Sequence, residues 1–195
     1  MPDIEPFSPR GMFHEGWTAE VKDYAIACGW ALKGKQFIVG DVAGGLFAFE
    51  GDTGITIWEK ENTHSGGLLA MAIHPEGEIF ATSGQDGNVK ICSCHEGKVI
   101  KTLDLGKGWV EHLKWSNDGL FLAIASSKKV YVFDEIGEEK WISEDHPSTV
   151  SEITWSDKNE LATACYGRVT FFDIVHNKTN QKLEWQGSLV SMELS

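Results

Sequence analysis

Arginine is nearly absent from this chain of 195 residues, which contains only Arg10 and Arg168 and has a formal net charge of −12 at pH 7. Proteins that bind nucleic acid usually present a basic face, because neutralising phosphate groups supplies much of their affinity. Proteins that bind anionic membrane surfaces carry clusters of Lys and Arg, and the sequence has no such cluster. We therefore expect neither a nucleic acid nor a membrane as partner. The acidic excess mainly favours solubility, and less often indicates a basic partner.

Long apolar runs are also missing, since no stretch approaches the roughly 20 residues that a membrane-spanning helix requires. The N-terminal stretch MPDIEPFSPRGMF lacks a cationic start followed by an apolar segment, so we expect no secretory signal. The four cysteines, Cys28, Cys92, Cys94 and Cys165, do not have the spacing of a disulfide framework. These features together predict a cytoplasmic location with reduced cysteines.

Proline is scarce as well, with 5 residues against 21 glycines, and no stretch shows a helical periodicity of useful length. Short apolar runs alternate instead with turn signals, most clearly over residues 64–92. There, runs at 68–73, 79–83 and 89–92 are separated by the turns His74-Pro75-Glu76-Gly77 and Gln85-Asp86-Gly87. Runs of this length between such turns are typical of strands. The chain is therefore predicted to be all-β.

The same pattern recurs along the chain. The last large residues of the predicted first strands are Trp30, Ile73, Trp115, Trp155 and Leu194, at intervals of 43, 42, 40 and 39 residues. Each interval holds four short strands, and such a period indicates repeated four-stranded sheets that stack on one another. The predicted divisions are an N-terminal arm at 1–24, units at 25–60, 64–104, 106–144 and 146–187, and a partial fifth unit at 188–195. We expect a last first-strand copy at 189–194.

The unit at 64–104 carries the most specific motif. His64 precedes its first run, Pro75-Glu76-Gly77 forms its first turn, and Ser83-Gly84-Gln85-Asp86-Gly87 precedes its third run. In these residues the chain resembles the WD40 repeat family, with about four to five degenerate repeats. Cys92-Ser93 stands where the family usually has Trp-Asp. The resemblance implies β-propeller blades and a structural hydrogen-bond chain of His64, Ser83 and Asp86, whose last partner is expected to be missing because Cys92 replaces tryptophan.

Catalytic and metal sites find little support. His64, Ser83 and Asp86 could suggest a Ser-His-Asp arrangement, but they are structural positions of the family, and no oxyanion site accompanies them. Cys92-x-Cys94-His95 has the wrong spacing for zinc, so Cys92 and Cys94 are interpreted as core residues. The glycine-rich stretch at 40–45 lacks the lysine and helix of a phosphate loop. We expect no enzyme activity, no metal and no cofactor.

The resemblance instead implies binding through the top face, formed by the loops before each first strand and between second and third strands. The positions beside the central opening are then Tyr24, Gly67, Trp109, Thr149 and Ser188. Tyr24 and Trp109 are candidate anchors for a protein partner, although Trp109 could instead cover a neighbouring blade. The same reasoning places five further residues on the top loops: Gln85, Lys107, Lys128, Tyr166 and Arg168.

Four units and one strand are fewer than the seven blades usual in the family. Three explanations remain open: a longer protein, a ring completed by a second copy or another subunit, or a short ring closed by the N-terminal arm. Open blade edges would also permit self-association. The favoured function is a non-enzymatic protein-interaction scaffold. The alternatives are an assembly subunit whose ring a partner completes, and a propeller enzyme or ligand sensor that uses the central channel.

Overall fold

The computed structural model describes residues 16–192, which form sixteen strands in four sheets and one short 3-10 turn, η1 (Leu32–Gly34). Blade 1 contains β1 (Ala25–Ala31), β2 (Gln36–Asp41), β3 (Leu46–Glu50) and β4 (Thr56–Lys60). Blade 2 contains β5 (Leu68–Ile73), β6 (Ile79–Gly84), β7 (Asn88–Ser93) and β8 (Val99–Asp104). Blade 3 contains β9 (His112–Trp115), β10 (Phe121–Ser126), β11 (Lys129–Asp134) and β12 (Glu139–Ile142). Blade 4 contains β13 (Val150–Trp155), β14 (Glu160–Cys165), β15 (Arg168–Asp173) and β16 (Lys178–Glu184).

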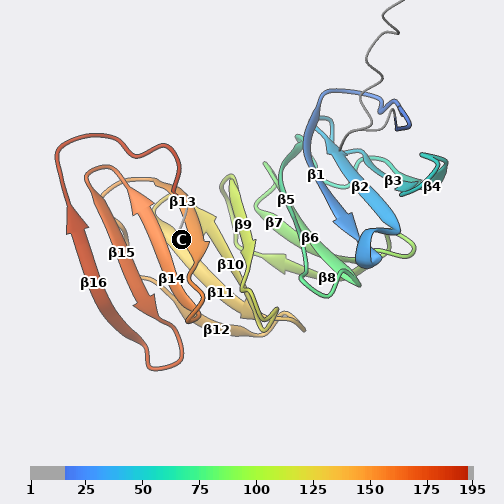
Figure 1. Cartoon of the computed structure of the whole chain (residues 1–195). Helices are drawn as coiled ribbons and strands as arrows, with labels where there is room; N and C mark the ends of the chain where they lie inside the picture. The colour runs from blue at the N-terminus through green and yellow to red at the C-terminus, as the bar shows by residue number, and fades with distance from the viewer. Residues whose placement is uncertain (1–15, 193–195) are drawn as a thin grey trace, which may run out of the picture.

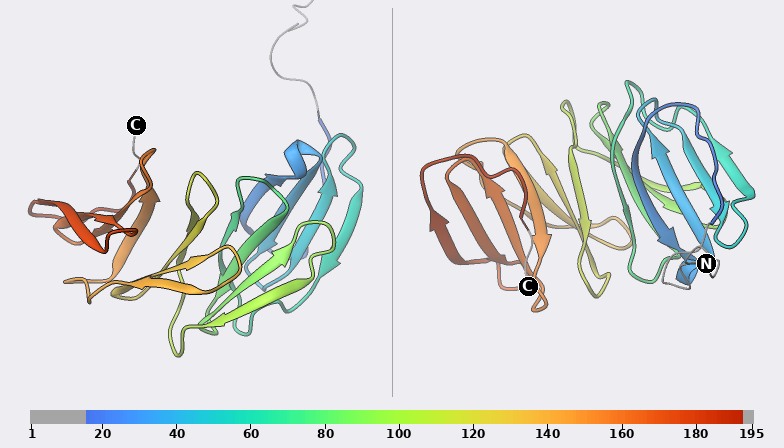
Figure 2. Two further views of the ribbon diagram at one scale, coloured as in Figure 1. Left: turned by 90° about the horizontal axis from the view of Figure 1, so that it is seen from below. Right: turned by 45° about the horizontal axis from the view of Figure 1, so that its top comes forward.

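Within every blade, strands that follow each other in the chain pair antiparallel, so each sheet is a simple meander. The four blades stand side by side in chain order along an arc (Figures 1 and 2). Their first strands are neighbours, because β1 contacts β5, β5 contacts β9 and β9 contacts β13. This arrangement confirms the predicted all-β fold of stacked four-stranded blades.

The core lies between the blades, as expected for sheets with two apolar faces. Ile38, Leu46 and Phe80 are fully buried between blades 1 and 2, and Val89, Leu122 and Ile124 between blades 2 and 3. Between blades 3 and 4, Val132 and Ile153 are buried in one apolar cluster to which both blades contribute. The core is therefore a series of layers, each shared by two adjacent blades.

Tryptophans at the predicted marker positions tie each blade to the one before it. The indole nitrogen of Trp115 donates to the carbonyl of Ala72 at 3.2 Å, and that of Trp155 donates to the carbonyl of Lys114 at 3.0 Å. Both side chains are about 5% exposed or less, whereas Trp30, at the same position of blade 1, is 54% exposed. No blade precedes blade 1 in the described structure. The marker tryptophan is thus buried only where a preceding blade supplies its carbonyl.

Segments outside the strands cover the outer faces of the first and last blades. Trp17 and Val21 pack against Val39, Phe47 and Phe49 of blade 1. On blade 4, Leu189 and Met192 pack against a cluster that contains Ala162, Ala164 and Val169. Both faces are apolar, so this packing removes their side chains from water.

Two predicted strands differ from the structure. Residues 189–192 form no strand, because no neighbouring strand pairs with their backbone; the rest of the predicted copy, 193–195, lies outside the described residues, as does 1–15 of the predicted arm. For the last strand of the unit at 146–187, the sequence pattern predicts residues 182–185, whereas the outermost strand β16 begins at Lys178. Every residue of β16 is exposed, so this strand has no alternating apolar pattern by which it could be recognised.

Candidate functional site

His64 lies at the centre of a buried hydrogen-bonded cluster in blade 2. Its Nδ1 lies 3.0 Å from Oδ1 of Asp86, and its Nε2 lies 2.9 Å from Oγ1 of Thr82. The prediction of Ser83 in this chain is wrong, because the Ser83 hydroxyl donates instead to the carbonyl of Val110 in the loop before blade 3. Side chains alternate between the two faces of a strand, so Thr82 and Ser83 necessarily point to opposite sides of β6.

The surroundings of His64 and Asp86 favour a neutral imidazole beside an ionised carboxylate. Burial lowers the pKa of the His64 imidazole and outweighs the opposing effect of Asp86. Burial alone would raise the pKa of the Asp86 carboxyl, but hydrogen bonds from His64 and from the N–H groups of Asn88 and Ser65 hold it below its ordinary value. A neutral His64 therefore donates from Nδ1 to the Asp86 carboxylate, and accepts the Thr82 hydroxyl proton at Nε2.

Blade 4 contains a second version of this cluster around His146. Its Nε2 lies 2.8 Å from Oγ1 of Thr163, and its Nδ1 lies 3.0 Å from the carbonyl of Lys128 in blade 3. Burial lowers the pKa of this imidazole as well. The backbone carbonyl takes the place that the Asp86 carboxylate has in blade 2. His146 thereby links blade 3 to blade 4.

The geometry of these clusters is structural rather than catalytic. The side chains of Thr82 and Ser83 are completely buried, so neither hydroxyl can meet a substrate. We expected one polar group of this chain to lack a partner because Cys92 replaces tryptophan. The structure shows no such group beside Cys92, because the unpartnered buried polar side-chain atoms of the described residues belong to Gln36 and to Nε of Arg168. The absent tryptophan is compensated by apolar packing, since Cys92 is fully buried among side chains of blades 1 and 2.

Cys92 and Cys94 are buried thiols whose pKa is raised to about 12 by burial. His95, the third potential ligand of the motif, is exposed and lies 2.9 Å from a carboxylate oxygen of Glu78. Within residues 16–192 no group of three potential metal-ligating side chains comes together. In the same range no helix has the length and apolarity needed to cross a bilayer.

Three of the candidate binding residues are prominent exposed aromatics at one end of the blades. Tyr24 is 82% exposed just before β1, Trp109 is 55% exposed just before β9, and Tyr166 is 61% exposed in the turn between β14 and β15. The start of a first strand and the end of an antiparallel second strand lie at the same end of a sheet. The fold therefore presents all three side chains at the end of the arc that we call the top face.

Hydrogen bonds hold the loops of the top face in place. The carbonyl of Tyr24 accepts from the N–H of Val42, and the carbonyl of Trp109 accepts from the Ser126 hydroxyl at 2.8 Å. The N–H of Tyr166 donates to the Ser148 hydroxyl at 2.9 Å. In each case the loop before a first strand is tied to the end of a second strand or to the turn that follows it. The aromatic side chains are thus carried on a preorganised backbone.

The remaining candidates divide into two groups. Lys107 and Lys128 are exposed in loops of the top face, and Gln85 is half-buried in the turn between β6 and β7. Arg168 differs, because its side chain turns into the space between blades 3 and 4 and pairs with Glu184 at 2.6 Å. The prediction that Arg168 belongs with the top-face loops is therefore corrected. Its backbone begins β15, and its long side chain follows the sheet instead of the turn.

Sequence reasoning missed one exposed apolar residue of this face. Val42 is 41% exposed in the turn that follows β2, and its N–H bonds to Tyr24. The signal was present, because a valine in the glycine-rich stretch 40–45 interrupts an otherwise small and polar turn. Val42 therefore extends the apolar surface beside Tyr24.

Four consecutive antiparallel meanders stacked around an arc define a protein of the β-propeller class. Comparisons with known proteins point to one family within this class. The WD40 domain model of anaphase-promoting complex subunit 4 matches residues 46–117. WD repeat-containing protein 1 of Bos taurus is 33% identical over 99 residues, which are 46% of this chain and 16% of that protein. These matches support the WD40 repeat family for this chain.

Two further comparisons agree with the fold. Actin-related protein 2/3 complex subunit 1A of Arabidopsis thaliana is 25% identical over 142 residues, covering 58% of this chain and 36% of the relative. The crystal structure of Chaetomium thermophilum Sqt1 bound to the N-terminus of the ribosomal protein L10 superposes with a TM-score of 0.74 at 19% identity. That match covers 84% of this chain and 50% of the Sqt1 chain. The chain thus spans only part of each relative's length.

Proposed function

We propose that the protein is a non-enzymatic interaction scaffold that binds a protein partner through its top face. The observation that carries this proposal is the placement of Tyr24, Trp109 and Tyr166, each more than half exposed, on loops that are fixed by hydrogen bonds. Large aromatic side chains on a rigid surface contribute much of the affinity of protein interfaces, because little conformational freedom is lost on binding.

The relatives support this reading at the level of the class. The Sqt1 structure contains a propeller in complex with a segment of another protein, the N-terminus of the ribosomal protein L10. A surface of preorganised loops on stacked blades suits the binding of such a segment. We propose the same mode of recognition for this chain, with a partner that remains to be identified by experiment.

Exposed lysines place local positive charge beside the aromatics. Lys107 lies two residues before Trp109, and Lys128 follows β10 at the same end of blade 3. The Lys128 ammonium donates to the carbonyl of Pro147 at 3.3 Å, which holds it across the boundary between blades 3 and 4. We infer that these lysines steer the partner and that the aromatics anchor it.

Quantitative affinity purification tests the proposal. Tagged wild-type protein and a Trp109→Ala, Tyr24→Ala double variant are compared, with Trp30→Ala as the matched control. Trp30 is 54% exposed, nearly the same as Trp109, but it lies at the opposite end of β1 from Tyr24. The double variant should lose at least tenfold of its retained partner while Trp30→Ala keeps it. Equal retention by the wild type and the double variant would contradict the proposed site.

A further inference from the structure

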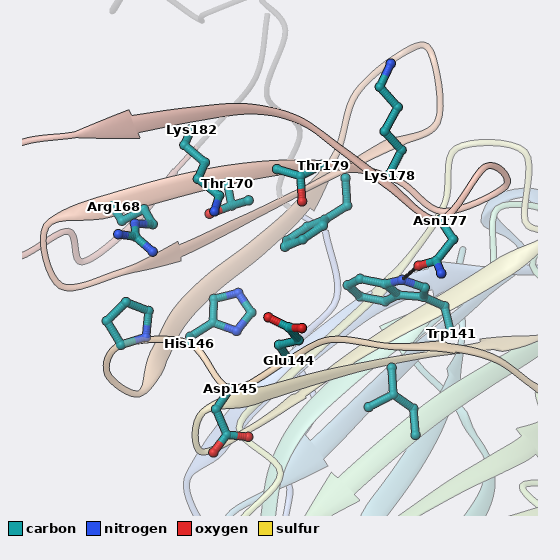
Figure 3. A pocket seen from close by; sticks show the side chains of 13 residues that line it. Trp141, Glu144, Asp145, His146, Arg168, Thr170, Asn177, Lys178, Thr179 and Lys182 are labelled. Carbon is teal, nitrogen blue, oxygen red and sulfur yellow. Dashed lines mark hydrogen bonds between the residues drawn. The ribbon is translucent and has the colours of Figure 1, made fainter.

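A cavity of about 410 Å³ lies on the outer side of the arc, between blades 3 and 4 (Figure 3). Trp141 and Ile142 of β12 and the following residues of the connection to blade 4 form one wall. Strands β15 and β16 of blade 4 form the other wall. The volume falls in the range of small-ligand sites.

Trp141, which lines the cavity, packs differently from its counterpart in blade 1. Trp58 of β4 stacks on Phe80 of blade 2 at 13° between ring planes, and its indole nitrogen donates to the backbone carbonyl of Cys94. Trp141 meets Phe172 of blade 4 at 54°, and its indole nitrogen reaches the Asn177 side chain at 2.7 Å. Trp58 thus stacks flat across its blade boundary, whereas Trp141 tilts towards a surface loop and stands at the side of an open space.

The wall from blade 4 supplies hydrogen-bond donors and positive charge. Arg168 pairs with Glu184 through Nη2, but its Nε is buried and has no partner among the described residues. Lys182 and Lys178 line the same wall and form no ion pair within residues 16–192. In Figure 3, the Arg168 and Lys182 side chains both extend toward the space above His146. Because Nε is closed to solvent, a ligand in the cavity would meet the outer part of the Arg168 guanidinium and the Lys182 ammonium.

The opposite wall does not neutralise this charge. Asp145 is engaged with Lys129 at 3.7 Å, which leaves Glu144 as the carboxylate of that wall without an ion pair in the described structure. Both nitrogens of His146 are already hydrogen-bonded, to Lys128 and Thr163. When the groups in ion pairs are left out on both walls, two lysines, Lys178 and Lys182, face one carboxylate, Glu144. The charge balance of the cavity favours an anion, in a protein whose net charge is −12.

We propose that this cavity binds an oxyanion, a carboxylate or phosphate group, through the guanidinium of Arg168 and the ammonium of Lys182. Charge-assisted hydrogen bonds of this kind are stronger than those between neutral groups. The indole of Trp141 and the ring of Phe172 offer an apolar wall for the carbon atoms that carry the anion. The site lies on the rim between blades 3 and 4 and is separate from the aromatic top face.

The scarcity of arginine makes this proposal directly measurable. With only two arginines in the chain, a proton–nitrogen correlation spectrum of the side-chain Nε–H groups contains two signals. The signal of Arg168 is identified by its loss in Arg168→Gln. Because Nε of Arg168 is buried, its proton should exchange slowly with water and be visible at neutral pH. Absence of a slowly exchanging Arg168 signal would contradict the arrangement on which the proposal depends.

The test titrates potassium phosphate and potassium acetate against the full chain, with ionic strength held constant by potassium chloride. The Arg168 signal should shift and saturate while the Arg10 signal stays in place. A response to phosphate alone identifies a phosphate ligand, and a response to both anions identifies a carboxylate-compatible site. The proposal is overturned if neither anion moves the Arg168 signal more than chloride does.

Matched lysine variants separate this site from general charge effects. Lys182→Gln should weaken the apparent affinity for the responding anion at least threefold, whereas Lys101→Gln, an exposed lysine on outer strand β8, should leave it unchanged. The indole N–H signal of Trp141 reports that the cavity wall is intact in each variant. Equal affinity of the two variants, with that signal unchanged, would show that Lys182 does not hold the anion.

Discussion

In blades 2 and 4, a single buried histidine holds the loop before the first strand against its neighbours. His64 links Thr82 to Asp86, and His146 links Thr163 to the carbonyl of Lys128 in the preceding blade. Both imidazoles must be neutral to accept a hydroxyl proton at Nε2. The stability of the two loops is therefore coupled to the protonation of these side chains.

This coupling predicts that the protein loses stability in mild acid. Burial lowers the pKa of both imidazoles below the ordinary value of 6.5, so the unfolded chain binds more protons just below that pH. The free energy of unfolding should be fully retained above pH 6.5 and fall as the pH drops from there toward the lowered values. Each group adds at most about 1.4 kcal/mol per pH unit. Urea unfolding at pH 7.5 and 5.5 measures the change.

Other groups titrate in the same range, so the contribution of one histidine is obtained by difference. His146→Gln removes the titrating imidazole, and its side chain can still donate to the Lys128 carbonyl. The variant should lose less stability than the wild type between pH 7.5 and 5.5. An unchanged or steeper loss in the variant would refute the neutral, buried state of His146.

At the residue scale, the sequence predicted which types of residue form the polar cluster, but it did not predict the direction in which each side chain points. The type of residue at 64, 83 and 86 indicated a polar cluster, but the strand face that points to His64 carries Thr82. Positions 82 and 83 both carry a hydroxyl, so the type of residue alone could not distinguish Thr82 from Ser83. Arg168 was misplaced for a similar reason, because its turn position does not reveal the path of a long side chain.

At the scale of the element, turns with left-handed backbone control how closely the blades approach. Gly87 has a φ of 74°, and a Cβ atom there would lie 2.0 Å from the carbonyl oxygen of Gly106 in the next loop. Gly34 has a similar φ of 85°, but a Cβ atom would meet nothing within 4 Å. The two glycines therefore have a similar backbone conformation, but only Gly87 lies so close to a neighbouring loop that a Cβ atom would clash with it.

The pair predicts two distinct costs of substitution by alanine. Gly34→Ala should lower the free energy of unfolding by about 1–2 kcal/mol, the cost of left-handed backbone alone. Gly87→Ala should lower it by more than about 3 kcal/mol, because the loops of blades 2 and 3 must also separate. Denaturant unfolding of both variants measures this, and equal losses would show that contact between the loops contributes nothing.

Strand existence was predictable from sequence, because inner strands are buried and carry apolar runs between glycine turns. The second strand β6, for example, begins at Ile79, where its apolar run predicted. The outermost strand β16 was predicted to be too short, since all its side chains are exposed and its pairing with β15 is a backbone property. Exposed edge strands therefore mark the limit of pattern-based assignment in this fold.

At the scale of the whole molecule, repetition creates equivalent positions whose environments differ. Trp30, Trp115 and Trp155 have the same place in their blades, but within residues 16–192 only the last two have a preceding blade that accepts the indole N–H. Trp58 and Trp141 likewise share a place in their blades, but Trp58 donates to the carbonyl of Cys94 in the next blade whereas Trp141 lines a cavity. The period of the sequence predicts the equivalence. It does not predict the differences, because they arise from packing between blades.

The proposed function also depends on the whole arrangement, since the top face is assembled from loops of four blades. Tyr24 and Tyr166 are far apart in the chain and are brought to the same end only by the antiparallel order of each sheet. The turns at the opposite end, such as 74–77 and 116–119, carry no part of the proposed site. A partner bound at the top should therefore leave these turns accessible.

Hydrogen exchange of the isolated complex, compared with the free chain, tests this central claim most directly. The account predicts slower exchange in the top-face segments 106–111 and 165–168 when the partner is bound, with the turns at 74–77 and 116–119 unchanged. Protection of those opposite turns without any change at the top face would contradict the account.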